Sequence, residues 1–241
     1  MSLWEYANPV KFMALSGRVL PFAAILTAAL LATGLIWGFF FTSDDFKQGS
    51  TVKIIFIHVP AAMMAINVWI MMLVASLIWL VRRHHVSALA ARAAAPIGVT
   101  MTLIALFTGA IWGKPMWGTY WAWDPRLTSF MILFVFYLGY LALWQAVEDD
   151  DTAADLTSIL CMVGSVFALL SRYAVNLWNQ GLHQGATLTA TERSPIDASY
   201  YYPLLISIAG FVLLFFTLVL LRTRMHIRLR RAKALLARSN A

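Results

Sequence analysis

Residues 54–81 read IIFIHVPAAMMAINVWIMMLVASLIWLV and contain no aspartate, glutamate, lysine or arginine. A helix that crosses the hydrocarbon core of a bilayer covers about 30 Å and needs roughly 20 apolar residues, at about 1.5 Å per residue. The stretch is long enough, so it predicts a transmembrane helix. The whole 241-residue chain has the same character, since 61% of its residues are hydrophobic and 12% are charged, whereas soluble domains are about 45–50% apolar. The composition predicts an integral membrane protein.

Five further segments flank this stretch and are similarly apolar. In the fifth helix only 16 uncharged residues separate Asp155 from Arg172, so that helix is short or its arginine reaches the headgroups. The first segment is too long for a secretory signal and lacks its small-residue cleavage site, so we expect it to be retained. We predict an all-α integral membrane protein, a single domain over residues 1–241 with six transmembrane helices. Their approximate limits are 19–41, 54–81, 93–112, 127–147, 155–175 and 199–221, followed by a basic tail over 222–241.

The distribution of lysine and arginine predicts the orientation. An even number of helices places both termini on one side, and basic residues are enriched in cytoplasmic segments. Twelve basic residues lie on the side of the termini and six on the other side. Without the tail over 222–241 these numbers are five and six, so the predicted orientation depends on the tail. Both termini are therefore predicted to be cytoplasmic, and the connections 42–53, 113–126 and 173–198 periplasmic. The net charge of +7 is explained by a tail lying against anionic membrane lipid, with no nucleic acid partner.

The cytoplasmic connections are predicted to be short, at 82–92 and 148–155. The acidic run Glu148-Asp149-Asp150-Asp151 is most simply a solvated turn, and a docking patch for a partner subunit is the alternative. Three histidines sit among arginines on this side and are predicted to be plain surface groups. They are His84, His85 and His226.

Two histidines on the other side are better candidates for a functional role. His58 lies about 6 Å below the start of the helix over 54–81, at about 1.5 Å per residue. An ionisable group at this depth is functional by default, but a neutral imidazole bonded to a neighbouring helix is an equally good interpretation. His183, in the connection 173–198, is by itself best interpreted as a surface histidine. Together they favour a haem site, because haem iron accepts two axial imidazoles and this is the one pair on the outward side.

An aromatic segment lies between these histidines in the sequence. Residues 112–123 contain four tryptophans and a tyrosine. Tryptophan is enriched at membrane interfaces, and Asp124 followed by Pro125 is typical of a helix N-cap and first residue. These explanations do not account for the density of rings, which predicts a flat aromatic shelf able to bury a porphyrin. The candidate haem contacts are Trp117, Trp121, Trp123 and Asp124, with Lys114, Arg126 and Arg172 for the propionates.

Cysteine usage limits how such a cofactor is held. Cys161 is the only cysteine of the chain. It excludes an intramolecular disulfide and a Cys-x-x-Cys-His attachment of haem to this chain. The haem is therefore expected to be bound without a covalent bond.

Three separated motifs resemble those of the haem-handling membrane proteins that carry the tryptophan-rich WWD signature, and within that family the CcmC group of cytochrome c maturation. The motifs are WGTYWAWDPRLTS at 117–129, IHVPA at 57–61 and WNQGLHQGAT at 178–187. The first motif is highly specific, and the two histidine motifs are specific mainly in its company. The resemblance extends over the whole chain, including its length and six-helix plan.

The resemblance implies a haem b site on the periplasmic side of a bacterial inner membrane. The WWD loop would form that site, with His58 and His183 as axial ligands of the iron. The family presents haem to a membrane-anchored chaperone, CcmE, and works with the ABC transporter subunits CcmA and CcmB and the small membrane subunit CcmD. We predict a haem-binding and transfer subunit that is not an enzyme, because two imidazoles occupy both axial positions of the iron. Its positioning of haem would assist covalent attachment to the chaperone.

Two other functions remain as alternatives. The first is a permease that exports haem or another small solute. Apart from His58 and Asn67, however, the helix interiors offer few polar groups to line a path, and paired broken helices are not apparent. The second is a membrane cytochrome, which needs several histidine pairs to step electrons across the bilayer.

Overall fold

The computed structural model describes residues 8–177 and 196–239, and within these ranges the chain is helical, with no strand. There are six long helices in the described ranges, and the first five are joined by short connections, one of which contains a 3-10 helix. All six are long and apolar enough to cross a membrane, which confirms the predicted all-α fold with six membrane-spanning helices. The elements are α1 (Pro9–Phe40), η2 (Ser50–Ile54), α2 (Ile55–Arg82), α3 (His85–Trp117), α4 (Pro125–Ala146), α5 (Asp150–Leu177) and α6 (Ala198–Ser239).

Three helices extend well beyond the predicted apolar limits. Helix α1 begins ten residues earlier than expected, where the Asn8 side chain accepts a hydrogen bond from the Val10 N–H at 2.8 Å and Pro9 is the first helical residue. Helix α3 begins at His85, so the connection expected over 82–92 consists of two residues between the helices. Helix α6 continues to Ser239, so most of the basic tail is helical. Hydropathy marks the part of a helix suited to hydrocarbon, and these helices continue past it through charged turns.

The acidic run is only in part the solvated turn that the sequence predicted, because Glu148 and Asp149 are exposed in the connection from α4 to α5 whereas Asp150 and Asp151 are helical. Asp149 caps α5, because its carboxylate accepts a hydrogen bond from the Thr152 N–H at 2.7 Å. Hydrogen bonds from the Thr152 side chain and N–H lower the pKa of Asp149 from its ordinary value. Asp150 and Asp151 form the first turn of α5, where the helix dipole favours negative charge.

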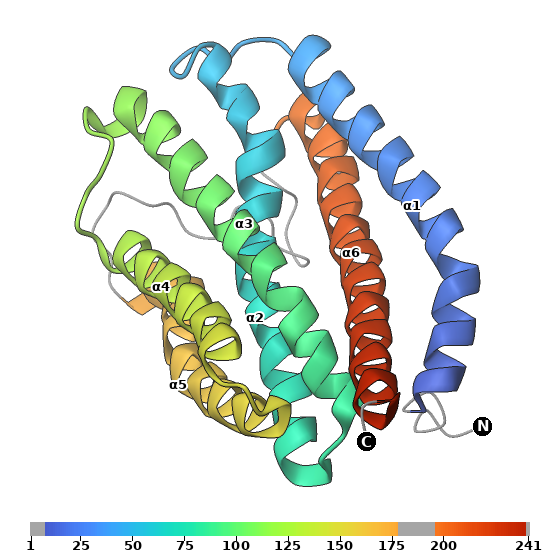
Figure 1. Ribbon diagram of the computed structural model, residues 1–241. Helices are drawn as coiled ribbons and strands as arrows, with labels where there is room; N and C mark the ends of the chain where they lie inside the picture. Colours follow the sequence, from blue (N-terminus) through green and yellow to red (C-terminus); the bar gives the residue numbers. More distant parts are fainter. Residues whose placement is uncertain (1–7, 178–195, 240–241) are drawn as a thin grey trace.

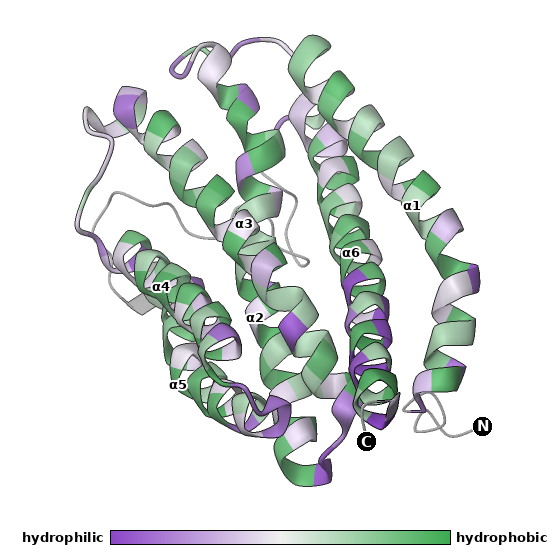
Figure 2. Cartoon of the chain, in the orientation of Figure 1, coloured by the Kyte–Doolittle hydropathy of each residue, from purple (hydrophilic) through white to green (hydrophobic). Residues whose placement is uncertain are grey.

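The helices pack in three pairs (Figure 1). Helices α1 and α6 form one flank, α4 and α5 form the other, and α2 and α3 lie between them. The start of α1 and the end of α6 lie at the same end of the bundle. Apolar residues cover the helices, whereas hydrophilic residues gather on the last turns of α6 and in the connections (Figure 2).

The centre of the bundle is filled by two large aromatic side chains. The indole of Trp69 and the ring of Tyr137 pack edge to face, with centroids 4.6 Å apart. The Trp69 Nε1–H donates to the Cys161 carbonyl oxygen at 3.1 Å, and the Tyr137 hydroxyl donates to the Ala65 carbonyl oxygen at 2.7 Å. Only glycine fits at position 98, since a Cβ there would lie 2.1 Å from the Tyr137 ring. This dense packing ties α2 to α3, α4 and α5.

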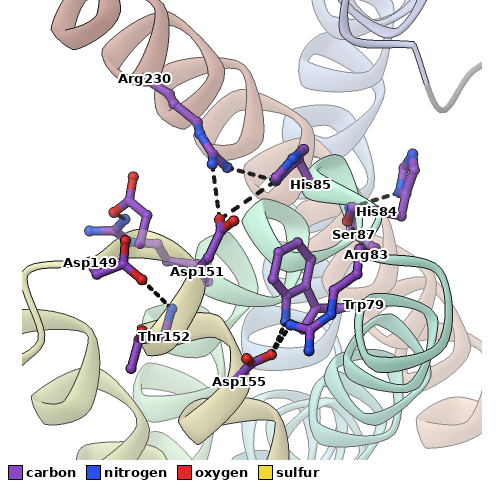
Figure 3. A network of polar contacts seen from close by, with 12 residues as sticks. Trp79, Arg83, His84, His85, Ser87, Asp149, Asp151, Thr152, Asp155 and Arg230 are labelled. Atoms are coloured by element: carbon purple, nitrogen blue, oxygen red, sulfur yellow. Dashed lines mark hydrogen bonds and ion pairs between the residues drawn. The ribbon is translucent and has the colours of Figure 1, made fainter.

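Polar contacts join four helices, α2, α3, α5 and α6, at the end of the bundle where α6 finishes (Figure 3). Arg230 of α6 donates to Asp151 of α5 at 3.0 Å and lies 3.0 Å from the Nδ1 of His85 in α3. Asp155 accepts a hydrogen bond from the Trp79 Nε1–H at 2.9 Å and pairs with Arg83. We call this region, residues 79–92, 149–155 and 222–230, the charged end.

Two of the histidines predicted to be plain surface groups have structural contacts here. The His84 Nδ1 accepts a hydrogen bond from the Ser87 N–H at 3.2 Å and so caps α3. His85 joins the contacts of Arg230 and Asp151 (Figure 3). The Nε2 of His226 is buried and makes no hydrogen bond to the described residues. His85 thus lies at the surface as predicted, with its side chain 51% exposed, although it contacts Asp151 and Arg230. His84 and His226 are partly buried, which the sequence did not predict, because helices α3 and α6 continue past the apolar limits and pack there.

Candidate functional site

The predicted site residues that the structure describes lie at the opposite end of the bundle. We call this region, residues 41–58, 108–129, 171–172 and 198–200, the aromatic end. It gathers the end of α1, the start of α2, the end of α3, the start of α4, the end of α5 and the start of α6. Two hydrogen bonds between distant segments hold it together: Trp112 to Gln48 at 2.7 Å and Tyr200 to the Ser43 carbonyl oxygen at 2.7 Å.

His58 lies in the first turn of α2 and is half-buried against α3. Its Nδ1 lies 3.0 Å from the hydroxyl oxygen of Thr108. The ring also packs on the backbone of Gly109, where a Cβ would lie 3.0 Å from the His58 Cε1. The bond to a neighbouring helix that the sequence left open is therefore present. It is compatible with a ligand role, because an imidazole has a second nitrogen.

The tryptophan segment differs in shape from the predicted loop. Helix α3 continues through Lys114 and Pro115 to Trp117 and is ended by Gly118, whose φ of 75° suits glycine and whose N–H donates to the Lys114 carbonyl oxygen at 3.0 Å. Only residues 118–124 form a loop, which descends from the end of α3 to the start of α4 (Figure 1).

The four indoles form two edge-to-face pairs rather than one flat shelf. The centroids of Trp112 and Trp117 lie 5.8 Å apart at 76°, and those of Trp121 and Trp123 lie 5.6 Å apart at 81°. Edge-to-face contact is the preferred arrangement of aromatic rings, and it explains why the segment is not flat. Trp123 is 75% exposed, so its indole offers a large apolar surface for a further contact.

Trp121 has a buried polar atom, the Nε1 of its indole. Its Nε1–H makes no hydrogen bond to any residue in the described ranges. Its backbone is held by Thr119, whose hydroxyl donates to the Trp121 carbonyl oxygen at 2.9 Å. A buried donor of this kind favours a ligand that carries an acceptor.

Asp124 has the capping role that the sequence predicted. Its carboxylate accepts a hydrogen bond from the Leu127 N–H at 2.6 Å, Pro125 is the first residue of α4, and the side chain is buried. The cap fixes where the tryptophan loop meets α4. The sequence alone predicted this cap, because its two signals, an aspartate and the proline after it, are adjacent in the chain.

Positive charge lies beside this cap. Arg126, in the first turn of α4, is close enough to Asp124 and Arg172 for their charges to interact. Helices α4 and α5 meet here, because the Ser171 hydroxyl donates to the Ser129 hydroxyl at 3.0 Å. Two arginines at one helix–helix contact suit paired carboxylates. Lys114, by contrast, is engaged locally, since its Nζ donates to the Gly118 carbonyl oxygen at 3.0 Å and lies 5.2 Å from the Tyr120 ring centroid.

His183 and the motif around it lie outside the described residues. The structure therefore places one of the two predicted iron ligands, the tryptophans and the arginines at the same end of the bundle. Sequence reasoning missed the contacts of Thr108, Gly109 and Gln48. No local pattern marks them, because each depends on how two helices or loops face one another.

The chain is similar to known proteins over nearly its whole length. The family model described as "CcmC: Heme exporter protein C" matches residues 2–238. The chain is 70% identical over 240 residues to heme exporter protein C of Paracoccus denitrificans, covering 100% of this chain and 99% of the relative. It is 68% identical over 235 residues to that of Rhodobacter capsulatus, covering 98% and 97% of the two chains. It is 43% identical over 223 residues to that of Escherichia coli K12, covering 92% and 89%.

These matches extend over nearly the whole length of the chain and of each relative. They therefore include all six helices and both ends of the bundle. The chain belongs to the CcmC family of heme exporter protein C.

Proposed function

We propose that this protein binds haem at its aromatic end and presents it to the haem chaperone CcmE during cytochrome c maturation. The observation that carries the proposal is the gathering, at one end of the bundle, of a half-buried imidazole, an exposed indole and two neighbouring arginines. The family's description as a heme exporter supports haem as the cargo. Haem is thus treated as a transferred substrate rather than a resident cofactor.

In this proposal the iron of haem b is held without a covalent bond between His58 and His183. The porphyrin lies against Trp117, Trp121 and Trp123, whose apolar faces exclude water from the ring. Arg126 and Arg172 pair with the propionates, and Asp124 keeps the loop in position. The Trp121 Nε1–H, buried without a partner in the described residues, is a donor suited to a propionate oxygen.

Two imidazoles would leave no open position on the iron. The site would therefore hold and orient haem, and its iron would not activate oxygen. This behaviour suits a transport subunit better than an enzyme. Orientation has a further use, since holding the vinyl edge outward would raise the rate of attachment to the chaperone by proximity. The high exposure of Trp123 supports a site that opens toward a partner.

The proposal includes the surroundings of the protein. Both termini are cytoplasmic and the aromatic end faces the periplasm of a bacterial inner membrane, in line with the basic residues on α6. Those basic residues contact anionic membrane lipid. The partners are CcmE, the ABC transporter subunits CcmA and CcmB, and the small membrane subunit CcmD.

A permease is the second candidate, because the relatives are described as exporters. The centre of the bundle argues against a path through this chain. Trp69 and Tyr137 are fully buried there, and buried hydroxyls such as Thr102 and Thr157 bond to carbonyls of their own helices. Proteoliposomes loaded with haem would separate the two functions, because a permease releases haem across the bilayer without its partners.

The direct test is the visible spectrum of the purified protein in nanodiscs after addition of haem. We expect the Soret band of a bis-imidazole complex, lost in both His58→Ala and His183→Ala. The control is His84→Asn at the charged end, where asparagine retains the helix cap and the band should persist. An unchanged band in either alanine variant removes that histidine from the site.

A further inference from the structure

The contact between α2 and α3 at His58 involves a chain of two hydrogen bonds. The Thr108 hydroxyl lies 2.6 Å from the Ile104 carbonyl oxygen one turn earlier in α3, and 3.0 Å from the His58 Nδ1. A carbonyl oxygen only accepts hydrogen bonds, so the single hydroxyl hydrogen of Thr108 is directed to Ile104. The hydroxyl oxygen must then accept from the imidazole.

This direction determines the tautomer of the ring. Since Thr108 accepts, the His58 Nδ1 carries the hydrogen, and the lone pair of the neutral imidazole is on Nε2. In the other tautomer, two lone pairs would face each other across 3.0 Å, unless the hydroxyl left its carbonyl partner. Because the site is half-buried, water would not fully replace the hydrogen bond that Thr108 would then lose to the Ile104 carbonyl oxygen.

We infer that Thr108 is a positioning residue that fixes His58 in the Nδ1–H tautomer, so that Nε2 is the atom presented to the haem iron. The inference rests on the proposed function in one respect, the ligand role of His58. Metal-bound histidines commonly donate their second ring N–H to an oxygen acceptor, which sets the tautomer and raises the basicity of the ligand. Here a threonine already held by its own helix supplies that oxygen.

Gly109 fixes the place of the ring beside this hydrogen bond. A Cβ at position 109 would lie 3.0 Å from the His58 Cε1, 3.6 Å from Nδ1 and 4.0 Å from Nε2. A side chain here would require the imidazole to shift by a few tenths of an ångström. The adjacent residues Thr108 and Gly109 thus act on the same ring, one by hydrogen bonding and one by leaving space.

The tautomer is tested first in the haem-free protein, so that the result does not depend on ligation. In protein labelled with ¹⁵N-histidine in nanodiscs, protonated and unprotonated ring nitrogens have well-separated shifts, and the His58 signals are identified by their absence in His58→Gln. We expect Nδ1–H in the wild type and in Thr108→Ser, and a mixture or the Nε2–H form in Thr108→Val. The matched control is Thr102→Val, which removes a hydroxyl bonded only to its own helix at 2.7 Å among the described contacts. A wild-type His58 in the Nε2–H form overturns the inference.

The role toward iron is tested second, by titrating haem into the same four proteins. We expect the affinity for haem to fall about 10- to 100-fold in Thr108→Val, with an altered low-spin spectrum, and to be restored in Thr108→Ser. Unchanged affinity and spectrum in Thr108→Val overturn the inference even if the tautomer has changed. Failure of the proposed function has a different signature, because the Soret band would then survive His58→Ala whatever the tautomer of the haem-free protein.

Discussion

The two ends of the bundle are built from different contacts. At the charged end, Asp151 and Asp155 of α5 each contact basic residues of other helices, and the polar groups mostly satisfy one another. At the aromatic end, large side chains face outward: Phe46 is fully exposed and Trp123 is 75% exposed. The polar groups of the charged end are thus largely paired within the chain, whereas the described residues of the aromatic end include large side chains that are exposed. Asymmetry of this kind is expected of a protein that receives and releases a cargo at one end.

The largest expected effect would come from breaking the charged end at Asp155. Its carboxylate accepts from the Trp79 indole, which is 1% exposed, and pairs with Arg83. Asp155→Ala leaves a buried donor without its acceptor, so we expect the free energy of unfolding to fall by about 1–3 kcal/mol, with haem binding unchanged. Cys161 is the only cysteine and is buried, so a thiol-reactive fluorophore reports unfolding during heating.

The aromatic end supplies the control for this measurement. Asp44 pairs with Lys53 at 3.0 Å, but its side chain is 57% exposed. Exposed ion pairs contribute little, so Asp44→Ala should change the free energy of unfolding by no more than about 0.5 kcal/mol. Equal destabilisation by the two substitutions would contradict the contrast between the ends.

Removal of an exposed indole should weaken haem binding and leave stability unchanged, the reverse of what is expected for Asp155→Ala. Trp123→Ala deletes a ring that the proposed function places against the porphyrin, and a lost aromatic contact of about 1.4 kcal/mol corresponds to a tenfold weaker affinity. Stability should hardly change, because the ring is already 75% exposed. Phe46→Ala is the matched control, since it removes an aromatic side chain at the same end but outside the tryptophan segment. If both variants bind haem as the wild type does, the exposed indoles have no part in holding it.

The apolar helices were predictable from the sequence because hydrocarbon imposes a minimum length of uncharged residues. The true helix ends were not, since water tolerates charged residues in a helix. Nothing in hydropathy shows that α1 begins at Pro9 or that α6 continues to Ser239. The second half of the acidic run was missed for the same reason. Acidic residues are as typical of a helix N-terminus as of a turn, and here the hydrogen bond from the Thr152 N–H to Asp149 marks the start of α5.

The candidate site divides in a similar way. The cap formed by Asp124 is encoded by neighbouring residues, so the sequence predicted it. The contact of His58 with Thr108 joins residues 50 positions apart and depends on how α2 and α3 are rotated about their axes, which a single sequence does not reveal. The flat shelf was wrong because ring orientation follows from edge-to-face packing rather than from the number of tryptophans.

The smallest expected effect concerns the hydrogen bond that joins two segments of the aromatic end, the connection after α1 and the last turns of α3. Gln48 accepts from the Trp112 Nε1–H at 2.7 Å, and Trp112 in turn packs edge to face on Trp117. Gln48→Leu keeps the size of the side chain but removes the acceptor, so we expect the free energy of unfolding to fall by about 0.5–1.5 kcal/mol.

Haem titration then distinguishes a local from a site-wide role of Gln48. If Trp112 holds Trp117 in place, the affinity of Gln48→Leu for haem should fall, but by less than in Trp123→Ala, because no proposed haem contact is deleted. Gln145→Leu is the matched control, since that glutamine is exposed in the last turn of α4, at the other end of this helix from the tryptophan segment 112–123. If Gln48→Leu loses stability but keeps its full affinity for haem, the loop over 42–49 stabilises the fold and has no part in haem binding. Suppose instead that Gln48→Leu lowers both the free energy of unfolding and the affinity for haem, and that Gln145→Leu lowers neither. The aromatic end would then depend on a hydrogen bond within the chain to keep its indoles in the position that binds haem.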